Sequence, residues 1–117
     1  MDNGFELLDP VNARAFLKRF GPQERRRGDS CFHRGCVVDL TPRKAGTDYT
    51  AQIQDEVQTD VELFYDPIEG WSGDCTCDKE VACHHQYAAM RALLAENSTA
   101  VVRNLSSTTP KGTRQDD

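Results

Sequence analysis

The sequence lacks the features that mark membrane-spanning and exported proteins. No run of about 18 apolar residues is present, so nothing in the sequence is expected to cross a bilayer. The N-terminal residues 1–6 carry neither a basic start nor an apolar stretch, which argues against a secretory signal and favours a cytoplasmic location. The 117 residues are 38% hydrophobic and 28% charged, a composition typical of one small globular domain with tails.

Motifs of common enzyme classes are also missing. The sequence contains no G-x-x-x-x-G-K-[ST] phosphate loop and no redox-type Cys-x-x-Cys. The stretch 70–73 is not a G-x-S-x-G nucleophile motif, because its second glycine falls one place early. No paired acid and base can be argued either. We therefore expect neither an enzyme nor a small-molecule substrate.

Charge is distributed unevenly along the chain. Residues 14–44 hold nine basic and three acidic residues, whereas residues 45–96 hold two basic and eleven acidic ones. Such asymmetry can be a solvated surface, or it can mark a surface for a charged partner. The candidates for contact with nucleic-acid phosphates are Arg14, Lys18, Arg19, Arg25, Arg26 and Arg27. The alternative is an acidic surface for a basic protein, with Asp55, Glu56, Asp60, Glu62 and Glu69.

Hydrophobic periodicity predicts an α+β fold. Asp9-Pro10 is typical of a helix start and Gly21-Pro22 of a helix end, with a basic loop over 23–30. Short β-branched or alternating segments then predict an antiparallel meander, with strands over 36–40, 49–55, 57–65 and 71–77. Strong helix formers predict a final helix over 86–96 that stops at Asn97, and the polar residues from Asn104 read as linker or disorder.

One short stretch concentrates metal-binding residue types. Residues 75–85 contain three cysteines and two histidines, the ligand types that zinc prefers. Cys75 and Cys77 are two apart, so on a strand both point to one side. Cys83 and His85 are also two apart, which fits a turn before a helix and its first turn. We expect one closed, structural zinc site with ligands Cys75, Cys77, Cys83 and His85.

Two alternatives remain open around this site. His84 could replace His85 as the fourth ligand, although a single backbone step from Cys83 makes convergence on one ion harder. Cys31, His33 and Cys36 could form part of a second site, but they lack a partner pair elsewhere. The preferred interpretation places Cys36 in the core and His33 on the surface.

The pattern of Cys75-x-Cys77, a gap of five residues and Cys83-x-His85, after a predicted meander and before an alanine-rich helix, resembles the SWIM zinc finger. The resemblance implies a ββα-like zinc-stapled strand-turn-helix with those four residues as ligands. It also implies binding of DNA or protein, beside a helicase-like ATPase or another DNA-acting protein. The expected organisation is a helix and basic loop over 1–27, a SWIM-type domain over 28–97 and a polar, flexible tail over 98–117.

Overall fold

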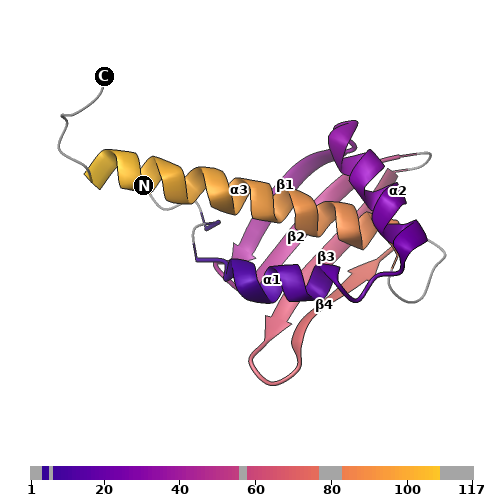
Figure 1. Ribbon diagram of the computed structural model, residues 1–117, viewed down its shortest axis with the longest axis horizontal. Coiled ribbons are helices and arrows are strands. Elements are labelled where there is room, and N and C mark those ends of the chain that lie inside the picture. The colour runs from indigo at the N-terminus through magenta and orange to yellow at the C-terminus, as the bar shows by residue number, and fades with distance from the viewer. Residues whose placement is uncertain (1–3, 6, 56–57, 77–82, 109–117) are drawn as a thin grey trace.

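The computed structural model describes residues 4–5, 7–55, 58–76 and 83–108, with side chains described as far as residue 101. Three helices and four strands follow one another in this part of the chain (Figure 1). In chain order they are α1 (Pro10–Leu17), α2 (Pro22–His33), β1 (Val37–Lys44), β2 (Asp48–Gln54), β3 (Gln58–Asp66), β4 (Gly70–Cys75) and α3 (His84–Thr108). The predicted α+β class is confirmed.

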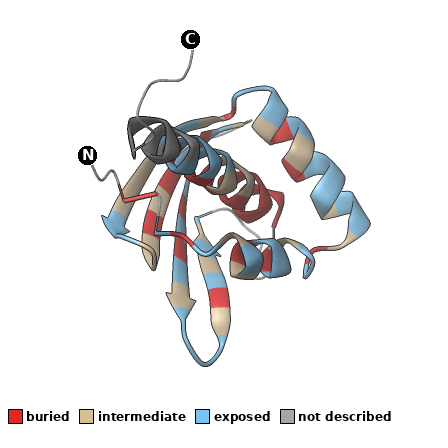
Figure 2. Ribbon diagram, turned by 60° about the vertical axis from the view of Figure 1, so that its left-hand side comes forward, coloured by how far each residue is buried: buried red, intermediate tan, exposed pale blue. Residues whose placement is uncertain are grey.

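The strands form one antiparallel sheet in the order β1-β2-β3-β4, which is the predicted meander. α3 lies across one face of this sheet, with α1 and α2 on either side of it (Figure 1). Tyr49, Ala51 and Ile53 of β2 all point into the core between the layers, as their alternation predicts. In Figure 2, red, buried positions alternate with pale blue and tan ones along β2 and β3.

The start of α1 follows its sequence signals. The Asp9 side chain accepts a hydrogen bond from the Val11 N–H at 3.0 Å, and Pro10 occupies the first helical position. The helix ends at Leu17, before the predicted end at Gly21-Pro22, and Phe20 beyond it is buried in the core.

The predicted loop over 23–30 is wrong, because these residues form most of α2. Pro22 starts the helix, and its apolar face is limited mainly to Gly28 and Cys31. This small apolar face is sufficient to pack α2 against α3, because Gly28 lets the two helices approach closely. A Cβ atom at position 28 would lie 2.5 Å from Cδ1 of Tyr87. An ion pair between Arg91 of α3 and Asp29 of α2 also joins the two helices.

Two predicted ends are also wrong. β1 does not stop at residue 40 but continues through Pro42 to Lys44. Proline is tolerated here because β1 is an edge strand, with no neighbouring strand on its outer side that needs the missing N–H. α3 continues past Asn97 to Thr108. Asn97 does not end the helix because its side-chain amide is buried and donates to the carbonyls of Phe5 (2.8 Å) and Leu8 (3.2 Å). No helix in the described part of the chain is long and apolar enough to cross a membrane.

Candidate metal centre

The end of β4 and the start of α3 bring three of the predicted ligands together. Cys75 is the last residue of β4 and is half-buried, and Cys83 immediately precedes α3 and is buried. The Cys83 carbonyl accepts hydrogen bonds from the N–H groups of Gln86 (3.1 Å) and Tyr87 (3.3 Å), which fixes the chain at the helix start. As predicted, Cys83 precedes the helix and His85 lies in its first turn.

The spacing of these three side chains matches a tetrahedral metal site. Nδ1 of His85 lies 3.7 Å from Sγ of Cys75 and 3.9 Å from Sγ of Cys83, and all three ligand atoms lie within 4.8 Å of one another. Around a tetrahedral zinc ion with ordinary bond lengths, sulfur and nitrogen ligands are separated by about 3.6 Å and two sulfurs by about 3.8 Å. The Cys75–Cys83–His85 cluster could therefore hold a metal ion such as zinc with little rearrangement.

The remaining predicted ligand, Cys77, lies outside the described residues. Its role as the fourth ligand stays a prediction. Two thiolates and one imidazole already make a soft donor set, which suits zinc better than magnesium or calcium.

Asp55, just after β2, completes the environment of the cluster. Its Oδ2 lies 3.3 Å from Nε2 of His85, whereas the two sulfurs lie near the other ring nitrogen, Nδ1. A carboxylate in this position accepts a hydrogen bond from a protonated Nε2, so that Nδ1 presents its lone pair to the metal. Ligating histidines in metal sites commonly have such a partner. The structure thus selects Nδ1 of His85 as the atom that would ligate the ion.

His84, the open alternative for the fourth ligand, faces the carboxylate rather than the thiols. Its Nε2 lies 3.0 Å from Oδ2 of Asp55, and its ring lies against the ring of His85 with centroids 4.1 Å apart. The hydrogen bond from His84 holds the pKa of Asp55 below its usual range, against the opposing effect of burial. Asp55, His84 and His85 also satisfy the geometry of a metal-binding group, but this group has no thiolate.

Sequence reasoning considered Asp55 only as part of an acidic surface. The signal that it belongs to the centre is the strand register: Ile53 pairs with Thr59, and Val61 pairs with Cys75. The end of β2 and the end of β4 therefore reach the same edge of the sheet. This relation depends on the pairing of three strands, so the distance in sequence between Asp55 and His85 conceals it.

Cys31, Cys36 and His33 are not part of this cluster. Cys31 and Cys36 are buried and His33 is exposed, which is the preferred of the two interpretations. Burial and the neighbouring Cys36 thiol raise the pKa of Cys31 to about 12, so that Cys31 is a neutral thiol. Within the described residues, none of these three joins a group of three metal ligands.

The six basic candidates divide between two parts of the helical layer. Arg14 is exposed on α1, and Lys18 and Arg19 are exposed just after this helix. Arg19 also donates a hydrogen bond to the carbonyl of Trp71 at 2.7 Å, which connects the end of α1 to β4. Arg25, Arg26 and Arg27 are exposed on α2. Arg26 and Arg27 line a hollow that also contains Asp55 and His84, next to the metal centre. The structure therefore separates the two halves of the predicted basic surface.

Comparisons of the chain with protein-family models, with curated proteins and with solved structures find no match. Function must accordingly be argued from the metal centre and the surfaces around it.

Proposed function

We propose that this chain is a zinc-binding module of the SWIM type that binds DNA, as an accessory to a helicase-like ATPase or another DNA-acting protein. The observation that carries the zinc part is the convergence of Cys75, Cys83 and His85 with separations suited to a tetrahedral ion. Zinc there is structural: it joins the end of the sheet to the start of α3. Cys77 supplies the fourth ligand and leaves no open position for a substrate.

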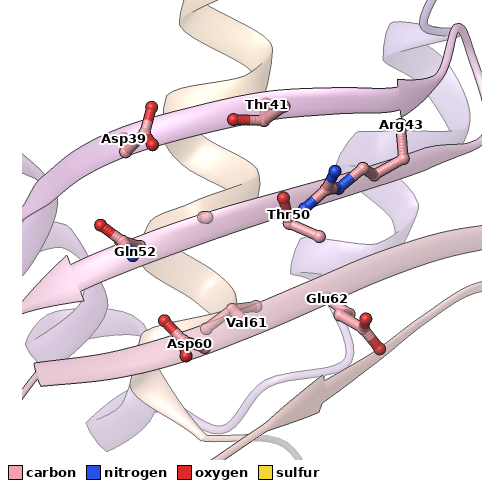
Figure 3. A pocket seen from close by; sticks show the side chains of 9 residues that line it. Asp39, Thr41, Arg43, Thr50, Gln52, Asp60, Val61 and Glu62 are labelled. Atoms are coloured by element: carbon pink, nitrogen blue, oxygen red, sulfur yellow. The ribbon is translucent and has the colours of Figure 1, made fainter.

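The DNA part is supported by the separation of charge between the two faces. The helical layer carries exposed basic residues, and five of them have side chains that make no hydrogen bond or ion pair to the rest of the described chain: Arg14, Lys18, Arg25, Arg26 and Arg27. The outward face of the sheet carries Asp39, Asp60 and Glu62 instead (Figure 3). Because DNA is a polyanion, it would approach the helical face, and binding would release counterions.

The test combines metal analysis with a salt titration of DNA binding. We expect about one zinc per chain, and an affinity for a DNA duplex that falls steeply as salt rises, with a log–log slope of about −0.9 for each phosphate neutralised. Removal of zinc with a chelator should abolish binding, because the start of α3 is no longer held to the sheet. Metal content near zero refutes the zinc assignment, and no binding at low salt refutes the DNA assignment.

A second candidate function uses the opposite face of the sheet. Asp39, Asp60 and Glu62 surround a shallow hollow of about 290 Å³, together with the hydrogen-bonding side chains of Thr41, Thr50 and Gln52 (Figure 3). Such a surface suits a basic segment of a protein. Arg43 also lines it and weakens its negative charge. Of the predicted acidic residues, Asp60 and Glu62 lie here, Asp55 faces the histidines, and Glu56 lies outside the described residues. Loss of a protein partner, with DNA binding retained, on Asp60→Asn and Glu62→Gln would favour this function.

A further inference from the structure

A hollow of about 330 Å³ lies between α2 and the metal centre. Arg26, Arg27, Ser30 and Arg34 line it from α2 and its C-terminal end, and Asp55 and His84 line it from the side of the sheet and α3. Its size is at the small end of the range for ligand pockets, roughly 300–1,000 Å³. It suits a compact group rather than an extended molecule.

The helical spacing explains why these four residues share one hollow. Positions 27, 30 and 34 follow one another at intervals of three and four, which places them on one face of a helix, and position 26 is four before 30. The triplet Arg25–Arg27 contributes only two of its arginines, since Arg25 does not line the hollow. Arg34, which sequence reasoning left out, supplies the third guanidinium.

The donors in the hollow are arranged so that hydrogen-bonding capacity remains. Nε of Arg34 donates to Oγ of Ser30 at 3.3 Å, which leaves the hydroxyl hydrogen of Ser30 able to point to a ligand. Nη2 of Arg34 lies 3.6 Å from Oδ1 of Asp55, but the side chain is 57% exposed and has further N–H groups. Arg26 and Arg27 form no ion pair with any described residue.

The balance of charge favours an anion. Three guanidinium groups face one carboxylate, that of Asp55, and this carboxylate is already engaged by His84 and His85. Its side chain is only 14% exposed, so it lies at the base of the hollow and the arginines lie around the opening. Guanidinium groups bind phosphate oxygens in a fixed, two-pronged geometry, and several of them with a hydroxyl match the tetrahedral arrangement of those oxygens.

We propose that this hollow, formed by Arg26, Arg27, Ser30 and Arg34, is a phosphate-binding site that takes one backbone phosphate of DNA. The inference rests on the proposed DNA-binding function and specifies where the backbone is anchored: on α2 beside the metal centre, and not on α1. Because Asp55 contacts Arg34, His84 and His85, an ion bound at the Cys75–Cys83–His85 cluster would help to hold one wall of the hollow in place.

The experiment uses the full, zinc-loaded chain and two probes. The first is inorganic phosphate, followed through the Nε–H resonances of the arginines in NMR spectra. The second is a short DNA duplex, followed by fluorescence anisotropy over a range of salt. The variants are Arg27→Gln and Arg34→Gln, and the matched control is Lys44→Gln at the end of β1, which removes one exposed charge outside both the hollow and the helical face.

We expect phosphate to shift the resonance of Arg34 and to leave that of Arg14 on α1 unchanged. Each pocket variant should bind the duplex about tenfold more weakly, the cost of one charge-assisted hydrogen bond. Its salt slope should be smaller by about 0.9. The control should lose less than about threefold. All of these substitutions change exposed side chains, so each variant should fold like the wild type. Amide NMR spectra that match the wild type would show that each variant is folded.

The possible results separate this inference from the proposed function. If the wild type binds DNA but Arg27→Gln and Arg34→Gln bind as well as Lys44→Gln, the phosphate site is refuted and DNA binding stands. If phosphate shifts Arg34 but no duplex binds at low salt, DNA binding is refuted and the hollow binds phosphate on another macromolecule, such as a phosphorylated protein. If neither probe binds, both are refuted.

Discussion

The substitution Asp55→Asn tests the geometry of the metal centre most directly. It keeps the size of the side chain and removes the charge that lies 3.0 Å from Nε2 of His84 and 3.3 Å from Nε2 of His85. An asparagine can present an N–H group to His85, and the imidazole can then place its proton on Nδ1, the atom that faces the two sulfurs. The variant should therefore bind zinc more weakly although every ligand is retained.

The magnitude follows from the burial of the groups. The histidine side chains are 9% exposed and that of Asp55 is 14% exposed, so solvent screens this contact poorly. Loss of a carboxylate behind a ligating histidine typically lowers metal affinity by about 10- to 100-fold. This range corresponds to about 1.4–2.7 kcal/mol of binding free energy.

The assay is competition for zinc between the protein and a chromophoric chelator. The control is Asp48→Asn, which removes the same charge at the start of β2, the opposite end of that strand from Asp55, and should change zinc affinity less than about twofold, because only a distant, screened charge is lost. If Asp55→Asn also stays within twofold of the wild type, Asp55 does not orient His85 and the reasoning fails. Ligation through Nε2 of His85, detected from its nitrogen chemical shifts, would refute it equally.

Three further predictions concern single residues. Cys83→Ala should lower the zinc content from about one per chain to near zero, measured by metal analysis, whereas Cys31→Ala, outside the cluster, should keep it. Gly28→Ala should reduce the free energy of unfolding, measured by urea unfolding, by about 1–3 kcal/mol, because the new methyl group would overlap Tyr87. The control Ser30→Ala, at an exposed position of the same helix, should change the free energy of unfolding by less than about 0.5 kcal/mol. The pKa of Cys31 is about 12 in the folded chain against an ordinary value of 9.0, so the folded state holds this proton more tightly than the unfolded state does. The free energy of unfolding should therefore fall by up to about 1.4 kcal/mol for each pH unit between pH 9 and pH 12. Urea unfolding at several pH values in this interval measures the effect.

Each of these predictions has an outcome that contradicts it. Zinc retained at full content in Cys83→Ala would remove this residue from the ligand set. Equal stability of Gly28→Ala and the wild type would mean that α2 can move away from α3 at little cost. A pH dependence between 9 and 12 that is identical in the wild type and in Cys31→Ala would show that other groups cause it.

The candidate metal centre and the proposed phosphate site share one corner of the molecule. Cys75 belongs to the sheet, Cys83 and His85 to the start of α3, and the arginines to α2 and its end. An ion at the cluster would hold the sheet against α3, and α3 in turn packs closely on α2 through Gly28 and Tyr87. Removal of zinc is therefore expected to disturb the arginines although none of them is a ligand.

Local features of the fold could be predicted because their causes are local. Asp9 accepts the N–H of Val11, two residues away, and Pro10 has a backbone suited to the first helical turn. The alternation of Tyr49, Ala51 and Ile53 reflects the two faces of a single strand. The spacing of the predicted ligands in 75–85 likewise constrains a short piece of chain, and the structure brings together the three of the four predicted ligands that it describes.

The features that were missed depend on contacts between distant elements. Asp55 joins the metal centre only because the register of three strands brings the ends of β2 and β4 to one edge. α2 carries few apolar residues, and it is a stable helix because Gly28 permits close packing on Tyr87. α3 runs past Asn97 because the amide binds the carbonyls of Phe5 and Leu8.

The sequence by itself determined the α+β class, the meander and the chemistry of the candidate metal ligands, since periodicity, caps and ligand spacing act over a few residues. Only the tertiary structure decided which histidine faces the thiols, which carboxylate orients it, and which of the arginines share a hollow. These relations are set by strand register and helix packing, where a shift of one residue would turn each strand side chain to the opposite face.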